Sequence, residues 1–189
     1  MADVRDALAR HAPRVLSARR RAAVAVVLHE RPSGSEALFI ERARHPMDPW
    51  SGHMAFPGGR VDPGDASAKA AAERETREEV GLDLEGAETL GRLDDLHAGI
   101  RVVAPLVLSA FVYRVERPPL LRPNREVEQA FWVPLAYLVD PARHVGRQWG
   151  PARLPGILVG EPDRHVVWGL TYQLLQGFFR VVGRPFPTV

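Results

Sequence analysis

The chain has 189 residues, of which 46% are hydrophobic and 25% are charged, and this composition is typical of one soluble globular domain. It contains no cysteine, so disulfides, thiolate metal sites and a cysteine nucleophile are excluded. Its net charge is only +2, and no apolar run approaches the roughly 18 residues that a membrane-spanning helix needs. We therefore expect a cytoplasmic protein that binds no membrane.

The N-terminal segment predicts a short amphipathic helix followed by a basic stretch. Val4 and Leu8 are four residues apart, as on one face of a helix, and three consecutive arginines occupy positions 19–21. No aromatic residues interleave with these arginines, so we interpret them as solvated charge and expect no nucleic-acid partner. We expect residues 1–21 to form a helical and basic appendage and residues 22–189 to form a single domain.

Short runs rich in β-branched residues predict the strands of a sheet. The predicted strands cover residues 22–28, 37–40, 90–96, 102–115 and 130–133. The fourth run is long enough to bend or divide at Pro105. A helix is predicted over 66–80, because these fifteen residues lack glycine and proline and Gly81 follows at a position that helix ends favour. A second helix is predicted over 166–182, after a stretch rich in proline and glycine, and the whole pattern indicates an α/β sandwich.

Three carboxylates meet on one face of the first of these helices. Glu75, Glu78 and Glu79 stand at spacings i, i+3 and i+4, and alanines one and two turns earlier leave space above the same face. Like charges at these spacings repel one another, and a divalent cation with hard oxygen ligands would neutralise them. The alternative is a solvated helix face that is simply rich in good helix formers.

The residues around these glutamates resemble the signature of the Nudix hydrolases, G-x5-E-x7-R-E-U-x-E-E-x-G-U, in which U is a bulky aliphatic residue. The matching positions are Gly59, Asp65, Arg74, Glu75, Thr76, Glu78, Glu79, Gly81 and Leu82. Asp65 replaces the first glutamate, eight residues rather than seven precede Arg74, and Thr76 replaces an aliphatic residue. The resemblance implies an α/β/α sandwich with a mixed sheet between helices.

The same resemblance implies hydrolysis of a nucleoside diphosphate linked to another moiety, with Mg²⁺ or Mn²⁺ as the cofactor. It makes Glu75 and Glu79 the principal metal ligands, Glu78 a third or water-mediated ligand, and the carbonyl of Gly59 a backbone ligand. Arg74 carries a rigid fork of donors that suits orienting the glutamates of its own helix.

The general base stays open between two groups of residues. Glu75 and Glu78 can act through water, whereas Glu126 or Glu128 can approach from a loop. The alternative for the last two is a solvated strand edge.

Asp65 has two readings. An inserted residue would turn it about 100° away from the carboxylate face if the helix ran continuously, which argues against a metal ligand. Because it follows Pro63-Gly64, it is suited to cap the start of the helix. A ligand or an outer carboxylate remains the alternative.

The departures from the general signature resemble the coenzyme A diphosphatase branch of the family, which shares the aspartate and the longer spacing. Gly52 and the Phe-Pro-Gly-Gly ending at Gly59 match that branch, as do Asn-Arg-Glu-Val at 124–127 and Trp-Gly-Leu-Thr at 168–171. Asp48 stands where an arginine of the branch belongs. The resemblance implies that coenzyme A is cleaved to 3′,5′-ADP and 4′-phosphopantetheine.

A substrate of this kind requires basic groups for its phosphates. The candidates are Arg42, Arg44, His53 and Arg60, each of which has a solvated surface residue as its alternative reading. Trp50 either packs against the substrate or buries a loop.

Two further functions compete with coenzyme A hydrolysis. One is a Nudix hydrolase acting on ADP-ribose, nucleotide sugars or nucleoside triphosphates, and the other is a binding module without catalysis. The related isoprenoid isomerases need a cysteine, which this chain lacks. The expected partner is a small nucleotide, and a homodimer stays open.

Overall fold

The computed structural model describes residues 1–45, 50–98 and 106–187. Its helices are α1 (Ala2–Arg10), α2 (Ala68–Val80), α3 (Leu135–Leu138) and α4 (Gly169–Val181), with a 3-10 turn at Pro141–Arg143. The main sheet contains β1 (Arg20–Arg31), β2 (Gly34–Arg42), β3 (Met54–Ala55), β4 (Gly58–Arg60), β5 (Glu88–Arg92), β6 (Leu96–Ala98), β7 (Leu106–Val115) and β8 (Val127–Pro134). A smaller sheet contains β9 (His144–Trp149), β10 (Ala152–Leu158) and β11 (Val166–Trp168).

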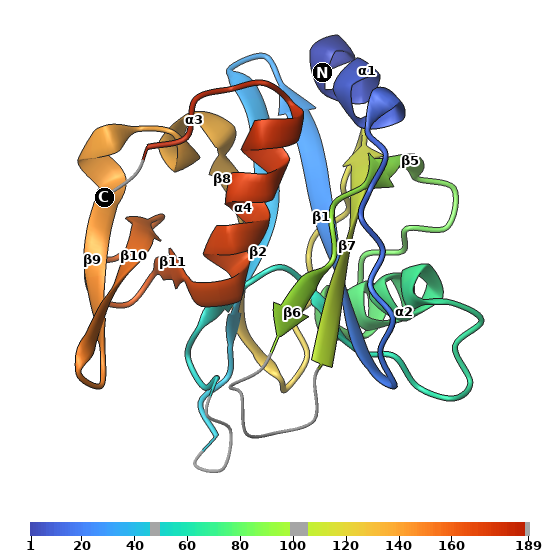
Figure 1. Ribbon diagram of the computed structural model, residues 1–189, viewed down its shortest axis with the longest axis horizontal. Coiled ribbons are helices and arrows are strands. Elements are labelled where there is room, and N and C mark those ends of the chain that lie inside the picture. The colour runs from blue at the N-terminus through green and yellow to red at the C-terminus, as the bar shows by residue number, and fades with distance from the viewer. Residues whose placement is uncertain (46–49, 99–105, 188–189) are drawn as a thin grey trace.

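The main sheet is mixed. Its strand order is β3-β2-β1-β7-β5, with β4 paired to β1, β6 to β7 and β8 to β2. β1 and β7 run parallel over ten residue pairs, whereas the other pairings are antiparallel. Figure 1 shows α4 on the side of the sheet that faces the viewer and α2 toward the other side.

Alternate residues of β1 point to opposite faces of the sheet and so enter two different hydrophobic cores. Ala23, Ala25 and Val27 pack with the small residues of α2 in one core. Val26 and Leu28 pack with the apolar residues of α4 in the other. The predicted α/β/α sandwich with a mixed sheet between helices is therefore confirmed.

The smaller sheet was not predicted, because its strands lie in the stretch rich in proline and glycine. Gly156 of β10 lies so close to β11 that a Cβ atom would stand 2.7 Å from the side chain of Val166. Pro155 lies in the part of β10 that pairs only with β9, where a missing N–H can be tolerated. Both residues therefore fit a strand only in this tertiary context.

The N-terminal segment packs against the main sheet. Val4 and Leu8 are buried, as their helical spacing predicts, and Gly91 of β5, at φ +158, leaves room for Leu8. Asp95 accepts a hydrogen bond from the backbone N–H of Leu16 at 2.9 Å, so the segment that follows α1 is also held. The division of the chain at residue 21 remains a prediction.

Several boundaries differ from those predicted. The strand expected over 90–96 is divided into β5 and β6, and the helix expected over 166–182 begins at Gly169, because the residues before it form β11. The predicted bend at Pro105 lies outside the described residues. Within the described segments, no helix is both long and apolar enough to span a membrane.

Candidate functional site

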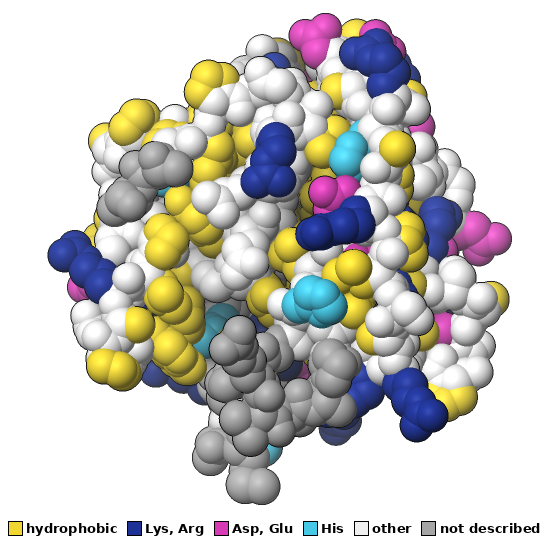
Figure 2. Space-filling view, viewed as in Figure 1, with side chains coloured by type: hydrophobic (Ala, Val, Ile, Leu, Met, Phe, Trp, Pro, Cys, Tyr) yellow, Lys and Arg dark blue, Asp and Glu magenta, His cyan; other side chains and the backbone are white. Residues whose placement is uncertain are grey.

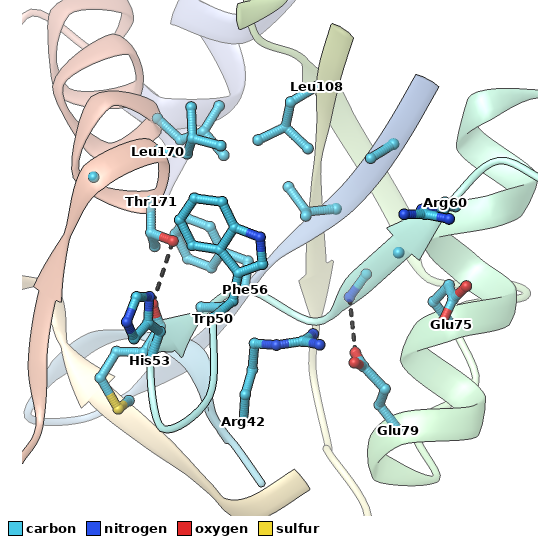
Figure 3. Close-up of a pocket in the computed structure, with 18 of the residues that line it drawn as sticks. Arg42, Trp50, His53, Phe56, Arg60, Glu75, Glu79, Leu108, Leu170 and Thr171 are labelled. Carbon is cyan, nitrogen blue, oxygen red and sulfur yellow. Dashed lines mark hydrogen bonds between the residues drawn. The ribbon is translucent and has the colours of Figure 1, made fainter. Parts of the chain in front are cut away.

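A cleft of about 580 Å³ opens between α2 and β4 on one side and β11 and the start of α4 on the other. It is lined by Ala22, Val24, Arg42, Trp50, His53, Met54, Ala55, Phe56, Gly58, Gly59, Arg60, Glu75, Glu79, Leu106, Leu108, Glu126, Trp168, Gly169, Leu170, Thr171 and Leu174. Figure 3 shows Glu75 and Glu79 on one side of this cleft, His53 and Trp50 toward the other, and Arg42 between them. Residues distant in the sequence are thus brought to one site.

Helix α2 owes its position to well-formed ends. Ser67 is the N-cap, and its hydroxyl accepts a hydrogen bond from the backbone N–H of Ala70 at 3.1 Å. Gly81 ends the helix in the left-handed conformation at φ +69. Thr76 is fully buried, and its hydroxyl donates to the carbonyl of Ala72 at 2.7 Å, so threonine replaces an aliphatic residue without an unpaired polar group.

The prediction that Asp65 caps α2 is wrong, because the helix begins three residues later and Ser67 occupies the cap. Asp65 instead accepts two hydrogen bonds from the guanidinium of Arg74, at 2.9 and 3.0 Å, and one from the backbone N–H of Asp62 at 2.8 Å. These donors hold the pKa of Asp65 below its usual range, with the bond from Arg74 the largest cause. Asp65 thus contacts Arg74, which in turn contacts Glu75 and Glu78.

Arg74 lies at the centre of the carboxylates. Besides Asp65, its guanidinium donates to Glu75 at 3.0 Å and to Glu78 at 3.2 Å, and it also reaches the carbonyl of Arg60 at 3.3 Å. The planar fork of donors is thus bonded to Glu75, as the predicted orienting role requires, and that role remains a prediction.

Glu79 is held by β4. Its side chain is only 2% exposed and accepts a hydrogen bond from the backbone N–H of Gly58 at 2.8 Å. Burial raises the pKa of Glu79 to about 8 and also raises the pKa of Glu75 above its usual value. Two partly desolvated carboxylates therefore face the same cleft.

Gly59 fits the expected close approach of backbone to this site. A Cβ atom on Gly59 would stand 2.5 Å from the carboxylate carbon of Glu75, so only glycine leaves that carboxylate in place. The backbone of β4 therefore runs directly against the acidic face of α2.

The donor set suits a hard divalent cation. Glu75 and Glu79 are one turn apart, and Glu126 lines the same cleft from the segment before β8, with an electrostatic influence on both. Carboxylate oxygens are the ligands that Mg²⁺ and Mn²⁺ prefer. Among the residues that the structure describes, however, no three acidic or histidine side chains form a preassembled metal site.

The other predicted site residues separate into two groups. Arg42, His53 and Arg60 line the cleft. Glu78 has a side chain that is 52% exposed and Arg44 is exposed, and both lie outside the cleft lining. Asp48, which departs from the coenzyme A diphosphatase pattern, lies outside the described residues.

Sequence reasoning missed the apolar wall of the cleft. Leu106 and Leu108 of β7 and Leu170 and Leu174 of α4 line it and belong to the same hydrophobic core cluster, and Figure 3 shows Leu108 near Leu170. A leucine in a strand or an amphipathic helix carries no sign of whether it faces a core or a cavity. The only signal was the Trp-Gly-Leu-Thr match at 168–171, which contributes four consecutive lining residues.

Comparisons with known proteins agree with this geometry. The family model for the NUDIX domain matches residues 19–152. The protein C14C4.10c of Schizosaccharomyces pombe is 43% identical over 114 residues, which are 55% of this chain and 33% of that protein, so the chain spans about a third of its length. NudL of Salmonella paratyphi B, named as an uncharacterized Nudix hydrolase, is 31% identical over 172 residues, which are 87% of this chain and 83% of NudL.

Solved structures share the fold at low sequence identity. A MutT/nudix family protein from Enterococcus faecalis has a TM-score of 0.60 at 18% identity and covers 93% of this chain and 66% of its own. The C. elegans Ap4A hydrolase has a TM-score of 0.51 at 22% identity, and the match covers 62% of this chain and 81% of the hydrolase. The NUDIX domain of Shewanella oneidensis NrtR, solved with ADP ribose, has a TM-score of 0.51 at 21% identity, and the match covers 69% of this chain and 82% of that domain.

Proposed function

Because the chain belongs to the Nudix hydrolase family, we propose that it cleaves the diphosphate linkage of coenzyme A or its derivatives. The products would be 3′,5′-ADP and 4′-phosphopantetheine. Cytoplasmic location and a homodimer remain predictions.

One observation carries the choice of coenzyme A. The three segments that resemble the coenzyme A diphosphatase branch are distant in sequence, yet all of them contribute to the cleft. They supply Gly58 and Gly59, Glu126, and the residues 168–171. Because these segments line both sides of the cleft that the acidic face of α2 enters, they are in a position to select what is bound there.

The cleft combines positive charge with an apolar wall, and this substrate requires both. Arg42 and Arg60 bring positive charge to the side where Glu75 and Glu79 lie, and such charge suits the phosphates. The leucines of β7 and α4 form an apolar wall, and an uncharged pantetheine arm can lie along it.

A divalent metal, Mg²⁺ or Mn²⁺, fits the carboxylates of Glu75 and Glu79, with the carbonyl of Gly59 as a further ligand. Glu78, which is exposed outside the cleft lining, would reach the metal only through water. Nudix hydrolases generally use such metals. When bound, the cation would neutralise charge on the phosphates and acidify water. The chain itself orients the ligands, since Arg74 holds Glu75 and the N–H of Gly58 holds Glu79.

In the proposed reaction, water attacks one phosphorus and the bond from that phosphorus to the bridging oxygen breaks. A base must accept the proton of the attacking water. Glu75 and Glu126 line the cleft, whereas Glu78 and Glu128 are exposed outside it. We therefore propose that the base is Glu126 or Glu75.

The direct test is a substrate panel assayed with Mg²⁺ and Mn²⁺, with products identified by mass spectrometry. The panel contains coenzyme A, ADP-ribose, a nucleotide sugar, diadenosine tetraphosphate and nucleoside triphosphates. We expect 4′-phosphopantetheine from coenzyme A at the highest kcat/KM of the panel. If no phosphopantetheine forms while another diphosphate is cleaved, coenzyme A is not the substrate.

A Glu79→Gln variant separates catalysis from binding alone. Glutamine keeps the volume and the acceptor for the N–H of Gly58, so the fold should persist while turnover falls at least 100-fold. Glu116→Gln is the matched control and should keep full turnover, because this side chain is 75% exposed and does not line the cleft. Full turnover in Glu79→Gln would refute the catalytic role of the carboxylates.

A further inference from the structure

Four aromatic side chains, which we call the aromatic cluster, pack together at one end of the cleft. They are Trp50, His53 and Trp168, which line the cleft, and Trp149, which packs against His53 and Trp168 outside the lining. The ring centroid of His53 lies 4.6 Å from that of Trp168, 5.6 Å from that of Trp149 and 5.7 Å from that of Trp50. The rings of Trp149 and Trp168 are 4.8 Å apart.

The members of the aromatic cluster differ in exposure. Trp168 is only 8% exposed and forms the base of the cluster, whereas Trp50 and Trp149 are 47% and 44% exposed. Figure 2 shows hydrophobic side chains gathered on the side of the molecule that β9, β10 and β11 build. Two partly exposed indoles beside the cleft offer a surface on which a planar group can stack.

The cluster is held in place before any ligand arrives. Trp149 belongs to β9 and Trp168 to β11, so both depend on the smaller sheet. Between β10 and β11, Arg164 donates two hydrogen bonds, at 2.9 and 2.8 Å, to the carboxylate of Glu41 in β2, which is only 1% exposed. This ion pair, whose carboxylate is buried and whose guanidinium is partly exposed, connects the smaller sheet to the main sheet. A preformed surface loses less entropy on binding.

We propose that the aromatic cluster binds the nucleobase of the substrate, stacked on the exposed indoles of Trp50 and Trp149. This inference rests on the proposed function, because it requires the diphosphate to lie at Glu75 and Glu79. Arg42, between those glutamates and Trp50, then faces the phosphates.

This orientation assigns the two halves of the substrate to different parts of the cleft. The nucleoside half lies toward the aromatic cluster, and the other half lies along the apolar wall of β7 and α4. Stacking tolerates any base, since every base has a π-face. The cluster therefore distinguishes a ligand that has a base from one that has none, rather than one base from another.

The test compares ADP with inorganic pyrophosphate, which lacks the base, by calorimetric titration in the presence of Mg²⁺. For Trp149→Ala we expect the Kd of ADP to rise about tenfold, which corresponds to about 1.4 kcal/mol. The Kd of pyrophosphate should change less than about twofold, and Trp149→Phe should recover most of the affinity for ADP. Tyr137→Ala, which removes another aromatic side chain that is 39% exposed, is the control and should leave both values unchanged.

The inference is overturned if Trp149→Ala weakens both ligands equally or neither, or if the wild-type protein binds ADP no more tightly than pyrophosphate. Thermal unfolding of each variant separates a lost contact from a lost fold. The substrate panel tests the assignment of coenzyme A, and this titration tests the aromatic site, so either proposal can be refuted without the other. If the protein does not cleave coenzyme A but Trp149→Ala weakens the binding of ADP and not of pyrophosphate, the aromatic site stands and only the assignment of coenzyme A is refuted.

Discussion

Gly58 and Gly59 are neighbours in β4, yet an added methyl group would meet different surroundings at each. At Gly59 the new Cβ would overlap the carboxylate of Glu75, which is the far end of a flexible side chain and can move away. At Gly58 it would overlap the carbonyl oxygen of Ala23 and stand 2.6 Å from the Cα of Val24, both of which are backbone atoms of β1. Gly58 also has φ +150, which a side chain rarely adopts.

These contacts predict opposite effects for the two substitutions. Gly58→Ala should destabilise the fold by about 3 kcal/mol or more, from backbone strain and overlap of about 1–3 kcal/mol each. In a protein of this size that lowers Tm by roughly 6–12 °C. Gly59→Ala should change stability by less than about 1 kcal/mol but lower kcat about 10- to 100-fold, because it displaces the carboxylate of Glu75.

Thermal unfolding and turnover of a diphosphate substrate with Mg²⁺, measured on the same preparations, check both expectations. Gly64→Ala is the control, because nothing lies within 4 Å of its added Cβ, and it should change neither quantity. Wild-type turnover in Gly59→Ala would refute the placement of its backbone against a functional Glu75. A loss of Tm in Gly59→Ala equal to that in Gly58→Ala would refute the distinction between backbone and side-chain overlap.

Three further substitutions test other parts of the structure. Ser67→Ala removes the cap of α2 and should lower Tm by roughly 2–4 °C, from about 1 kcal/mol, with kcat unchanged. Asp65→Asn weakens the hydrogen bonds that hold Arg74 and should lower kcat about tenfold, with a smaller change in Tm than in Ser67→Ala. An unchanged kcat would show that the pair of Asp65 and Arg74 does not orient the site. Asp95→Asn should cost about 3 kcal/mol at neutral pH, measured by urea unfolding, because Asp95 is fully buried against Arg92. Burial raises the pKa of Asp95, but the hydrogen bonds from Arg92 and from the N–H of Leu16 outweigh it and bring the pKa below the ordinary 3.8. The stabilisation by Asp95 is therefore complete above about pH 4 and is lost as the pH falls through the folded-state pKa. This acid-dependent loss of stability should be missing in Asp95→Asn.

The acidic face of α2 could be predicted from the sequence because its geometry is local. A run without glycine or proline, a glycine at its end and a period of 3.6 residues are enough to bring Glu75 and Glu79 to one face. The partner of Asp65 could not be predicted in the same way. Whether that carboxylate caps the helix or pairs with Arg74 depends on the turn before Ser67, which adds residues outside the helical period.

The opposite wall of the cleft depends on contacts between distant segments. The smaller sheet has proline and glycine inside β10, and these residues are compatible with a strand only because β9 pairs with one part of it and β11 approaches another closely. Since local propensity disfavours strands there, no reading of the segment alone could have brought Trp149 to Trp168, or either of them to His53.

Part of the wall opposite α2 lies outside the residues that match the family model. The match to the NUDIX domain ends at residue 152, so α2 and β4 lie inside it, whereas Trp168 and α4 lie beyond it. Glu41, which forms the ion pair with Arg164, immediately precedes Arg42 at a bulge in β2. A displacement of the smaller sheet would therefore be transmitted to Arg42 and to the aromatic cluster together, while the carboxylates of α2, held by Arg74 and the N–H of Gly58, would stay in place. The fold thus attaches Arg42 and the proposed base-binding surface to the smaller sheet, and the proposed metal ligands to α2 and β4.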